Sequence, residues 1–112
     1  MSQGDRPPGK RQLRVIGGDW RGRKLSFPSR VSLRPTTDRV RETLFNWLAP
    51  RVEGAHCLDL FAGSGALGIE ALSRGARRCD FVDTDQQAID AIEQNLQSLG
   101  ASEQATLRTC QA

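Results

Sequence analysis

The second half of the chain alternates short apolar runs with segments of helical periodicity. The runs at residues 56–61, 80–83 and 105–110 predict three strands. Between the first two strands, residues 66–74 predict a helix that ends at Gly75. Because strands and helices that alternate along a chain build a parallel sheet, this order predicts an α/β fold with part of a doubly wound sheet.

A second helix is predicted after the strand at residues 80–83. Thr84 and Gln87 stand at the spacing of a capping box, and Gly100 marks the end of the helix. We expect the helix to pack on the sheet through one apolar face, which carries Ile89, Ile92, Leu96 and Leu99.

The first half predicts a helix that begins after Thr36-Thr37-Asp38, which offers N-cap residues, and that Pro50 ends. Its apolar stripe is expected to face the core and consists of Val40, Leu44, Trp47 and Leu48. Three charged residues lie off this stripe and are expected to face solvent, namely Arg39, Arg41 and Glu42.

Before this helix, the segments Leu13–Ile16 and Lys24–Phe27 flank a Gly17-Gly18-Asp19 turn signal, which predicts a small hairpin. Basic side chains surround one tryptophan in it, a mixture that suits phosphate contact and base stacking. The candidate RNA-binding residues are Arg14, Trp20, Arg21, Arg23 and Lys24. An ordinary solvated face is the alternative interpretation of the same residues.

The distribution of charge supports an anionic partner. Residues 1–55 carry 12 Lys/Arg against 5 Asp/Glu, whereas residues 56–112 carry 4 against 8. The net charge of +3 therefore hides a strongly basic first half. Segregation of this kind favours nucleic acid as the partner.

Length and composition limit the class of protein. With 112 residues, 38% of them hydrophobic and 26% charged, the chain fits one globular domain. No apolar stretch approaches about 18 residues and no apolar run follows the N-terminal charges, so we expect a cytoplasmic protein without a membrane span. We divide the chain into a flexible basic tail (1–12), a basic hairpin (13–30) and a partial domain (31–112).

Cysteines give no sign of a metal site. The three stand far apart, with no C-x-x-C pair among them. We expect small buried thiols, neither metal ligands nor disulfides, at Cys57, Cys79 and Cys110.

The most informative segment is Asp59–Gly68, in which a strand runs into glycines at G-x-G-x-x-G spacing and then into a helix. Such glycines permit a tight turn, close approach of the backbone to a ligand, and close packing of helix on strand. Asp83 ends the next strand, 20 residues after Gly63, where the pattern expects a carboxylate for ribose hydroxyls. These features together predict a nucleoside-cofactor site.

The charge of Asp59 separates two cofactors. A dinucleotide brings an anionic pyrophosphate to the helix N-terminus, where a nearby carboxylate would repel it. S-adenosylmethionine carries an ammonium and a sulfonium instead, so the same carboxylate attracts it. The charges favour S-adenosylmethionine over NAD, with a carboxylate that caps backbone N–H groups as the alternative role for Asp59.

Three segments together resemble a known family: LRPTTDRVRETLFNWL at 33–48, CLDLFAGSGALGIEALSRGA at 57–76, and FVDTD at 81–85. They are similar to the bacterial 16S ribosomal RNA guanine-N2 methyltransferases of the RsmD type, which modify guanine 966. The resemblance runs from about Arg14 to Ala112. It implies a Rossmann-like, S-adenosylmethionine-dependent methyltransferase fold whose parallel sheet is truncated and preceded by the basic hairpin and one helix.

The resemblance also implies roles for single residues. Asp59, Gly63 and Gly65 match the family's first cofactor motif, and Asp83 matches its ribose-binding acid. Gln111 stands where related enzymes often place Asp or Asn near the adenine. The segment before the first motif folds over the cofactor in similar enzymes. The full set of cofactor-binding candidates is Thr37, Arg39, Asp59, Phe61, Gly63, Gly65, Asp83 and Gln111.

One motif of that family is missing. Its members transfer the methyl group at an [Asp/Asn]-Pro-Pro-[Tyr/Phe] motif after the fourth strand, and here the only Pro-Pro is Pro7-Pro8. We therefore expect no catalytic residue in these 112 residues and no activity from them alone. The implied partner of the longer enzyme is 16S ribosomal RNA or a small-subunit particle, and we expect a monomer.

Two alternatives remain at this point. An NAD-dependent oxidoreductase fragment has the same glycine spacing. An RNA-binding module could keep a cofactor-type fold without chemistry, as the absent motif allows.

Overall fold

The computed structural model describes residues 10–28, 38–60 and 62–110. Within these ranges, 3₁₀ turns occur at Gly18–Trp20 and Ser102–Gln104. Within the described residues, no helix has the length and apolar character needed to cross a membrane. The strands and helices, in chain order, are β1 (Lys10–Arg14), β2 (Lys24–Pro28), α1 (Asp38–Val52), β3 (His56–Leu60), α2 (Ala66–Ser73), β4 (Arg78–Asp83), α3 (Gln86–Leu99) and β5 (Ala105–Thr109).

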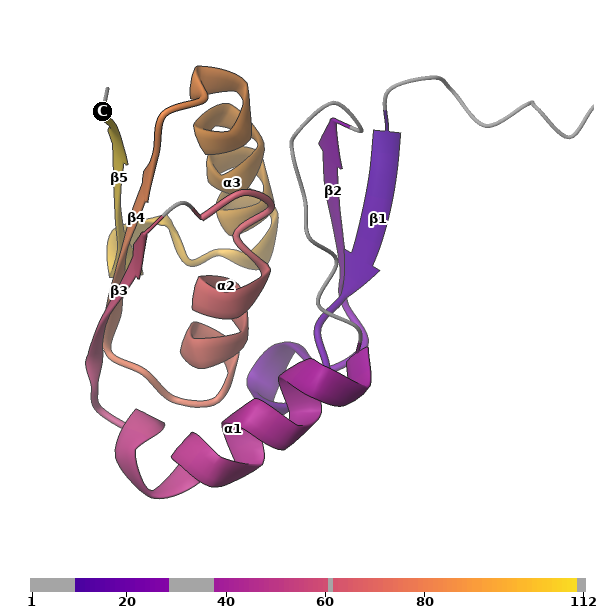
Figure 1. The fold of residues 1–112 in the computed structure, drawn as a ribbon, viewed down its shortest axis with the longest axis vertical. Coiled ribbons are helices and arrows are strands. Elements are labelled where there is room, and N and C mark those ends of the chain that lie inside the picture. Colours follow the sequence, from indigo (N-terminus) through magenta and orange to yellow (C-terminus); the bar gives the residue numbers. More distant parts are fainter. Residues whose placement is uncertain (1–9, 29–37, 61, 111–112) are drawn as a thin grey trace, which may run out of the picture.

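The described elements form three layers. β3, β4 and β5 make a parallel sheet with β4 in the middle, and β1 pairs with β2 as an antiparallel hairpin. Helices α2 and α3 lie between this sheet and the hairpin, while α1 crosses one end of the helical layer (Figure 1). The predicted parallel sheet, preceded by a hairpin and a helix, is therefore confirmed.

Apolar side chains from all three layers form the core. Ile69 and Leu72 of α2 and Ile92 and Leu96 of α3 are buried, together with Phe81 in the central strand. Burying one such side chain fully contributes about 1.5–3 kcal/mol. The hairpin joins the same core through two further buried residues, Val15 and Leu25.

Helix α3 begins one residue later than the capping box predicted. Its N-cap is Asp85, whose side chain accepts a hydrogen bond from Gln87 N at 2.9 Å. The prediction that Thr84 caps the helix is wrong, because the Asp85 carboxylate, one residue further along, accepts the hydrogen bond from the free backbone N–H group. The predicted end at Gly100 is confirmed, and this residue adopts the left-handed conformation with φ 72°.

Helix α1 buries a different face from the predicted one. Val40 is 55% exposed and Trp47 77% exposed, whereas Arg41 is fully buried at 0% and Phe45 is buried. The expectation that Arg41 faces solvent is therefore wrong. Arg41 follows Val40 by one residue, and one residue corresponds to a rotation of about 100° around an α-helix. The buried face is therefore rotated by about this angle from the predicted stripe.

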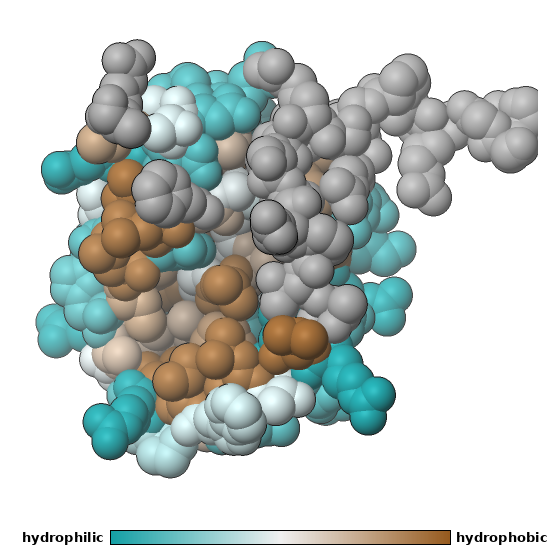
Figure 2. All heavy atoms as spheres, in the orientation of Figure 1, coloured by the Kyte–Doolittle hydropathy of each residue, from teal (hydrophilic) through white to brown (hydrophobic). Residues whose placement is uncertain are grey.

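The exposed stripe of α1 continues onto the sheet. Leu58 and Leu60 lie on the outer side of β3 and are 62% and 57% exposed. With Val40, Trp47 and Leu48 they give this side of the molecule a broad apolar surface (Figure 2). The helices cover the opposite face of the sheet, so a one-sided sheet leaves these leucines uncovered within the described residues.

Two smaller expectations also fail. Helix α1 runs through Pro50 to Val52. The proline has no N–H to donate to the carbonyl of Asn46, an exposed residue, and the helix continues despite this lost hydrogen bond. Cys79 is buried and Cys57 partly so, but Cys110 is exposed because β5 ends at Thr109.

Candidate functional site

The glycine loop joins the end of β3 to the start of α2. Gly63 and Gly65 have φ of 58° and 79°, in the left-handed region that favours glycine. Gly65 N donates to Ala62 O at 2.8 Å and closes the turn. A Cβ at Gly65 would lie 2.8 Å from Ile92 Cγ1, so the loop packs closely on α3. Both conformation and packing therefore require glycine here.

Gly68, the third glycine of the pattern, lies inside α2 and sets the distance between helix and sheet. A Cβ at this position would lie 2.8 Å from Cys79 Sγ and from Phe81 Cζ, both in the central strand. The close approach also lets Gly68 N donate to Asp59 Oδ2 at 3.0 Å. The third glycine thus permits the helix–strand packing that the spacing predicted.

We expect Gly68→Ala to lower the free energy of unfolding by about 1–3 kcal/mol, because an added methyl overpacks a filled core. Urea denaturation of both proteins measures the difference. Gln97→Ala, at an exposed position of α3, is the control for introducing an alanine into a helix without overpacking. Equal stability of Gly68→Ala and the unaltered chain would contradict the close packing.

Two carboxylates hold the loop at the carboxyl ends of β3 and β4. Asp83 Oδ2 accepts from Gly63 N at 2.8 Å, and its Oδ1 accepts from Asp85 N at 2.8 Å. Asp59 accepts from Gly68 N, so it also performs the alternative role of capping a backbone N–H group. The structure therefore brings Asp59, Gly63, Gly65 and Asp83 to one edge of the sheet.

This edge carries uncompensated negative charge. Neither Asp59 nor Asp83 forms an ion pair within the described part of the chain. Burial raises the pKa of the Asp59 carboxyl to about 6, while the hydrogen bond from Gly68 lowers it and the charge of Asp83 raises it further. A cation bound beside Asp59 would relieve this repulsion, so the residues present fit a ligand with positive charge near the loop.

The other expected cofactor residues are less well placed or fall outside the described ranges. Arg39 is exposed in the first turn of α1, where it lines a groove of about 400 Å³ with Val40, Leu44 and Trp47. The remaining three candidates lie outside the described residues, namely Thr37, Phe61 and Gln111.

The basic residues of the hairpin lie at its surface. Arg14, Arg21 and Lys24 are exposed, and the exposed Arg23 donates through Nη2 to Ser98 O at 3.1 Å. Trp20 is only partly exposed and packs against the core. The cations are therefore accessible to a ligand, whereas Trp20 has part of its surface committed to packing.

Sequence reasoning did not identify the polar side chains that join the elements around the site. Glu70, in the middle of α2, is 0% exposed, and Ser73 and Asn95 are also buried. One feature of the sequence indicates that Glu70 is buried. It stands in a short helix whose other residues are almost all apolar, and such a helix has no polar face that could place Glu70 in solvent.

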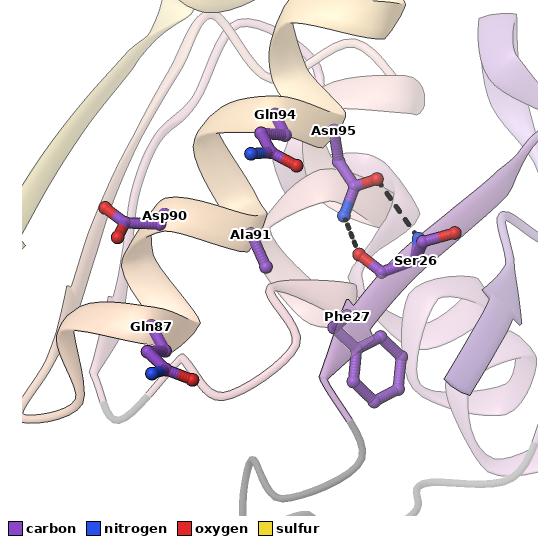
Figure 3. Close-up of a pocket in the computed structure, with 7 residues that line it drawn as sticks. All are labelled: Ser26, Phe27, Gln87, Asp90, Ala91, Gln94 and Asn95. Carbon is purple, nitrogen blue, oxygen red and sulfur yellow. Dashed lines mark hydrogen bonds between the residues drawn. The ribbon is translucent and has the colours of Figure 1, made fainter. Parts of the chain in front are cut away.

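A cavity of about 340 Å³ lies between β2 and α3 (Figure 3). Asn95 Nδ2 donates to Ser26 O at 2.9 Å and Asn95 Oδ1 accepts from Ser26 N at 3.1 Å, at one end of the cavity. Gln87 and Asp90 of α3 line it further along. It contains neither Asp59 nor Asp83 and is separate from the glycine loop.

Solved structures establish the class of protein. A structure described as "Putative methyltransferase yhhF from Escherichia coli" is 54% identical, has a TM-score of 0.83, and matches 91% of this chain and 55% of that one. A structure described as a "putative methylase" from Haemophilus influenzae is 44% identical with a TM-score of 0.69, and the match covers 91% of this chain and 53% of that one. With the parallel sheet and glycine loop described above, these matches define part of a Rossmann-like methyltransferase fold.

The sequence identifies the family. Residues 13–112 match the family described as "Conserved hypothetical protein 95", and the chain belongs to it. Ribosomal RNA small subunit methyltransferase D of Escherichia coli K12 is 58% identical over 93 residues, which cover 83% of this chain and 47% of the relative. The Haemophilus influenzae protein of the same name is 52% identical over 100 residues, which are 88% of this chain and 52% of that relative. The chain thus spans about half the length of these curated relatives.

Proposed function

We propose that this chain is the cofactor-binding part of an S-adenosylmethionine-dependent methyltransferase that modifies a guanine N2 amine of 16S ribosomal RNA. The observation that carries the proposal is the glycine loop held by Asp59 and Asp83, a negatively charged edge that suits a cationic nucleoside. The names of the relatives support ribosomal RNA as the substrate. The basic hairpin supports the same choice of partner.

In this proposal the two carboxylates have different tasks. Asp83 would accept hydrogen bonds from the ribose hydroxyls, while Asp59 would attract the positively charged methionine end. When bound, the cofactor supplies an electrophilic methyl carbon, whose bond to sulfur breaks as the guanine nitrogen bonds to it, and the amine then loses a proton. The orientation of that amine requires polar groups of the [Asp/Asn]-Pro-Pro-[Tyr/Phe] kind, which these 112 residues lack.

Methyl transfer tests the proposal directly. Tritium transfer from labelled S-adenosylmethionine to 16S RNA or 30S particles is measured for this chain and for a version extended through an Asp/Asn-Pro-Pro motif. We expect transfer only by the extended version, because much of the rate depends on holding the reacting atoms in line. Equal turnover by both would show that the catalytic part is not missing, and no transfer by either would contradict the proposed reaction.

The pKa of Asp59 predicts opposite effects of pH on cofactor binding and on folding. Below pH 6 a protonated Asp59 no longer attracts a cation, so affinity for S-adenosylmethionine should fall by up to about tenfold per pH unit. Because the folded pKa is raised above the ordinary 3.8, stability should instead increase as pH falls through about 6. Calorimetric titration and urea denaturation between pH 4.5 and 8, chosen as roughly bracketing this pKa, measure both. In Asp59→Asn the loss of affinity below pH 6 and the rise in stability through about pH 6 should both disappear, and an unchanged pH profile would contradict the role of Asp59.

The hairpin cations predict the salt dependence of RNA binding. Replacing Arg14, Arg21, Arg23 and Lys24 by Gln should flatten the plot of log affinity against log salt by about 0.7 for each single-strand phosphate that the protein no longer neutralises. Arg77→Gln with Arg108→Gln is the control, because these exposed residues lie on other elements. If the four hairpin substitutions change the slope no more per residue than the control pair, RNA binds elsewhere.

A further inference from the structure

The hairpin is attached to the methyltransferase layers through its backbone. Glu70 Oε1 accepts from Ile16 N at 2.9 Å and Oε2 accepts from Gly17 N at 2.8 Å. Ser73 Oγ accepts from Trp20 N at 2.9 Å and donates to Gly17 O at 2.6 Å. Two buried side chains of α2 therefore bind both sides of the hairpin turn.

A third buried side chain holds the other end of the hairpin. Asn95 of α3 binds the N–H and the carbonyl of Ser26 together, as a neighbouring strand would (Figure 3). We call Glu70, Ser73 and Asn95 the hairpin clasp. Because every hydrogen bond from the clasp to the hairpin goes to backbone, the basic side chains of the hairpin are left available to a ligand.

The turn also approaches α2 too closely for larger residues. Gly18 has φ 81°, and a Cβ there would collide with Ser73 O. This close approach and the hydrogen bonds of the clasp together restrict the position of the turn on α2.

Glu70 has the most polar partners within the clasp. Besides the two backbone N–H groups, it accepts from Arg74 Nε at 2.8 Å and lies 3.5 Å from Arg41 Nη1 of α1. All of its surface is buried, so these partners must satisfy its charge. One carboxylate thereby joins the hairpin, α1 and α2.

The same short helix carries the glycine loop. Gly65 is the N-cap of α2, and Glu70 follows five residues later, about 7.5 Å along the helix axis. One rigid helix therefore links the turn of the basic hairpin to the loop beside Asp59. The distance between hairpin cations and cofactor loop depends on the clasp.

We propose that Glu70, supported by Ser73, is a positioning residue that fixes the RNA-binding cations of the hairpin relative to the cofactor loop. This inference rests on the RNA-binding role in the proposed function. Cations held in place lose less freedom on binding than cations on a loose hairpin, so opening the clasp weakens RNA binding even though every phosphate-binding side chain is still present.

The sign of the effect separates positioning from net charge. Glu70→Gln removes one negative charge, which by itself strengthens binding to RNA. The control Glu93→Gln removes the same charge from an exposed site on α3. We expect Glu70→Gln to weaken the affinity for a 16S RNA transcript by roughly 2- to 30-fold, and Glu93→Gln to leave it equal or stronger.

Hydrogen exchange supplies a readout that general destabilisation would not reproduce. In Glu70→Gln the amides of Ile16 and Gly17 should lose more protection than those of β3 to β5, which report only the global loss of stability, while the affinity for S-adenosylmethionine stays unchanged. Ser73→Ala is the second variant, because it opens the clasp without leaving a buried charge unpaired. If Glu70→Gln does not fold, Ser73→Ala decides the outcome by the same RNA measurement and by the exchange of the Trp20 amide, from which Ser73 Oγ accepts a hydrogen bond.

Three results would overturn the inference in distinguishable ways. Unchanged exchange at Ile16 and Gly17 would show that the clasp does not hold the turn. Faster exchange with RNA affinity equal to that of Glu93→Gln would show that the held position is irrelevant to RNA. Absence of RNA binding by the unaltered chain would overturn the RNA-binding part of the proposed function, and the positioning role with it.

Discussion

Glu70→Leu is expected to lower the free energy of unfolding by about 3–5 kcal/mol, the cost of leaving a buried charge without its partner. Arg41 is fully buried, and its Nε and Nη1 make no hydrogen bond with the described residues. Without Glu70 its only ion-pair partner in that part of the chain is Asp38, 2.7 Å from Nη2. The backbone N–H groups of Ile16 and Gly17 lose their acceptor as well.

Arg41→Met should cost less, because Glu70 keeps Arg74 and both backbone donors. The double variant should be destabilised by less than the two single effects added together, since neither charge is then buried without its partner. Urea denaturation of the four proteins gives the coupling free energy. Additive effects would show that the two side chains do not stabilise each other.

Asp83→Ala is expected to weaken S-adenosylmethionine binding by roughly 10-fold to over 100-fold, which corresponds to removing one charge-assisted hydrogen bond. Its carboxylate also orders the loop through Gly63 N and Asp85 N, so the substitution removes both an acceptor for the ribose and a support of the loop. Calorimetric titration measures the affinity. Asp59→Ala is expected to weaken binding over the same range by removing the charge that attracts the methionine end.

Asp90→Ala is the matched control, because it removes one exposed carboxylate of α3 away from the glycine loop. It should leave cofactor affinity unchanged. A parallel titration with NAD tests the competing cofactor, which the negative edge should reject. Unchanged S-adenosylmethionine affinity in both Asp83→Ala and Asp59→Ala would refute the assignment of the cofactor site.

Local sequence determined the parallel sheet and the position of the glycine loop. Strands β3 to β5 and helices α2 and α3 follow from apolar runs, periodicity and terminal glycines, which act over a few residues. The spacing of 20 residues also predicted Asp83 as a carboxylate of the cofactor site, and the structure places it at the loop, where it accepts from Gly63 N. Parallel neighbouring strands bring their carboxyl ends to one edge, so the spacing of two motifs suffices to predict their meeting.

Only the tertiary structure decided which face of α1 is buried. Local periodicity favours Val40, Leu44, Trp47 and Leu48 as the inward stripe, because it counts apolar residues on a single helix. Burial of Arg41 instead depends on Glu70, which stands in another helix and is matched to it by charge. A charged residue is buried when a partner distant in sequence compensates it, and no pattern within one helix contains that partner.

The attachment of the hairpin was likewise decided by long-range interactions. The turn glycines and basic residues predicted a hairpin, but the clasp joins residues 53 to 69 positions apart in the sequence. Glu70, Ser73 and Asn95 bind backbone groups, which every residue has. No residue type in the hairpin sequence therefore indicates which side chains hold it. The sequence therefore determined the elements and the cofactor edge, while the position of the basic hairpin relative to that edge depended on side chains buried between layers.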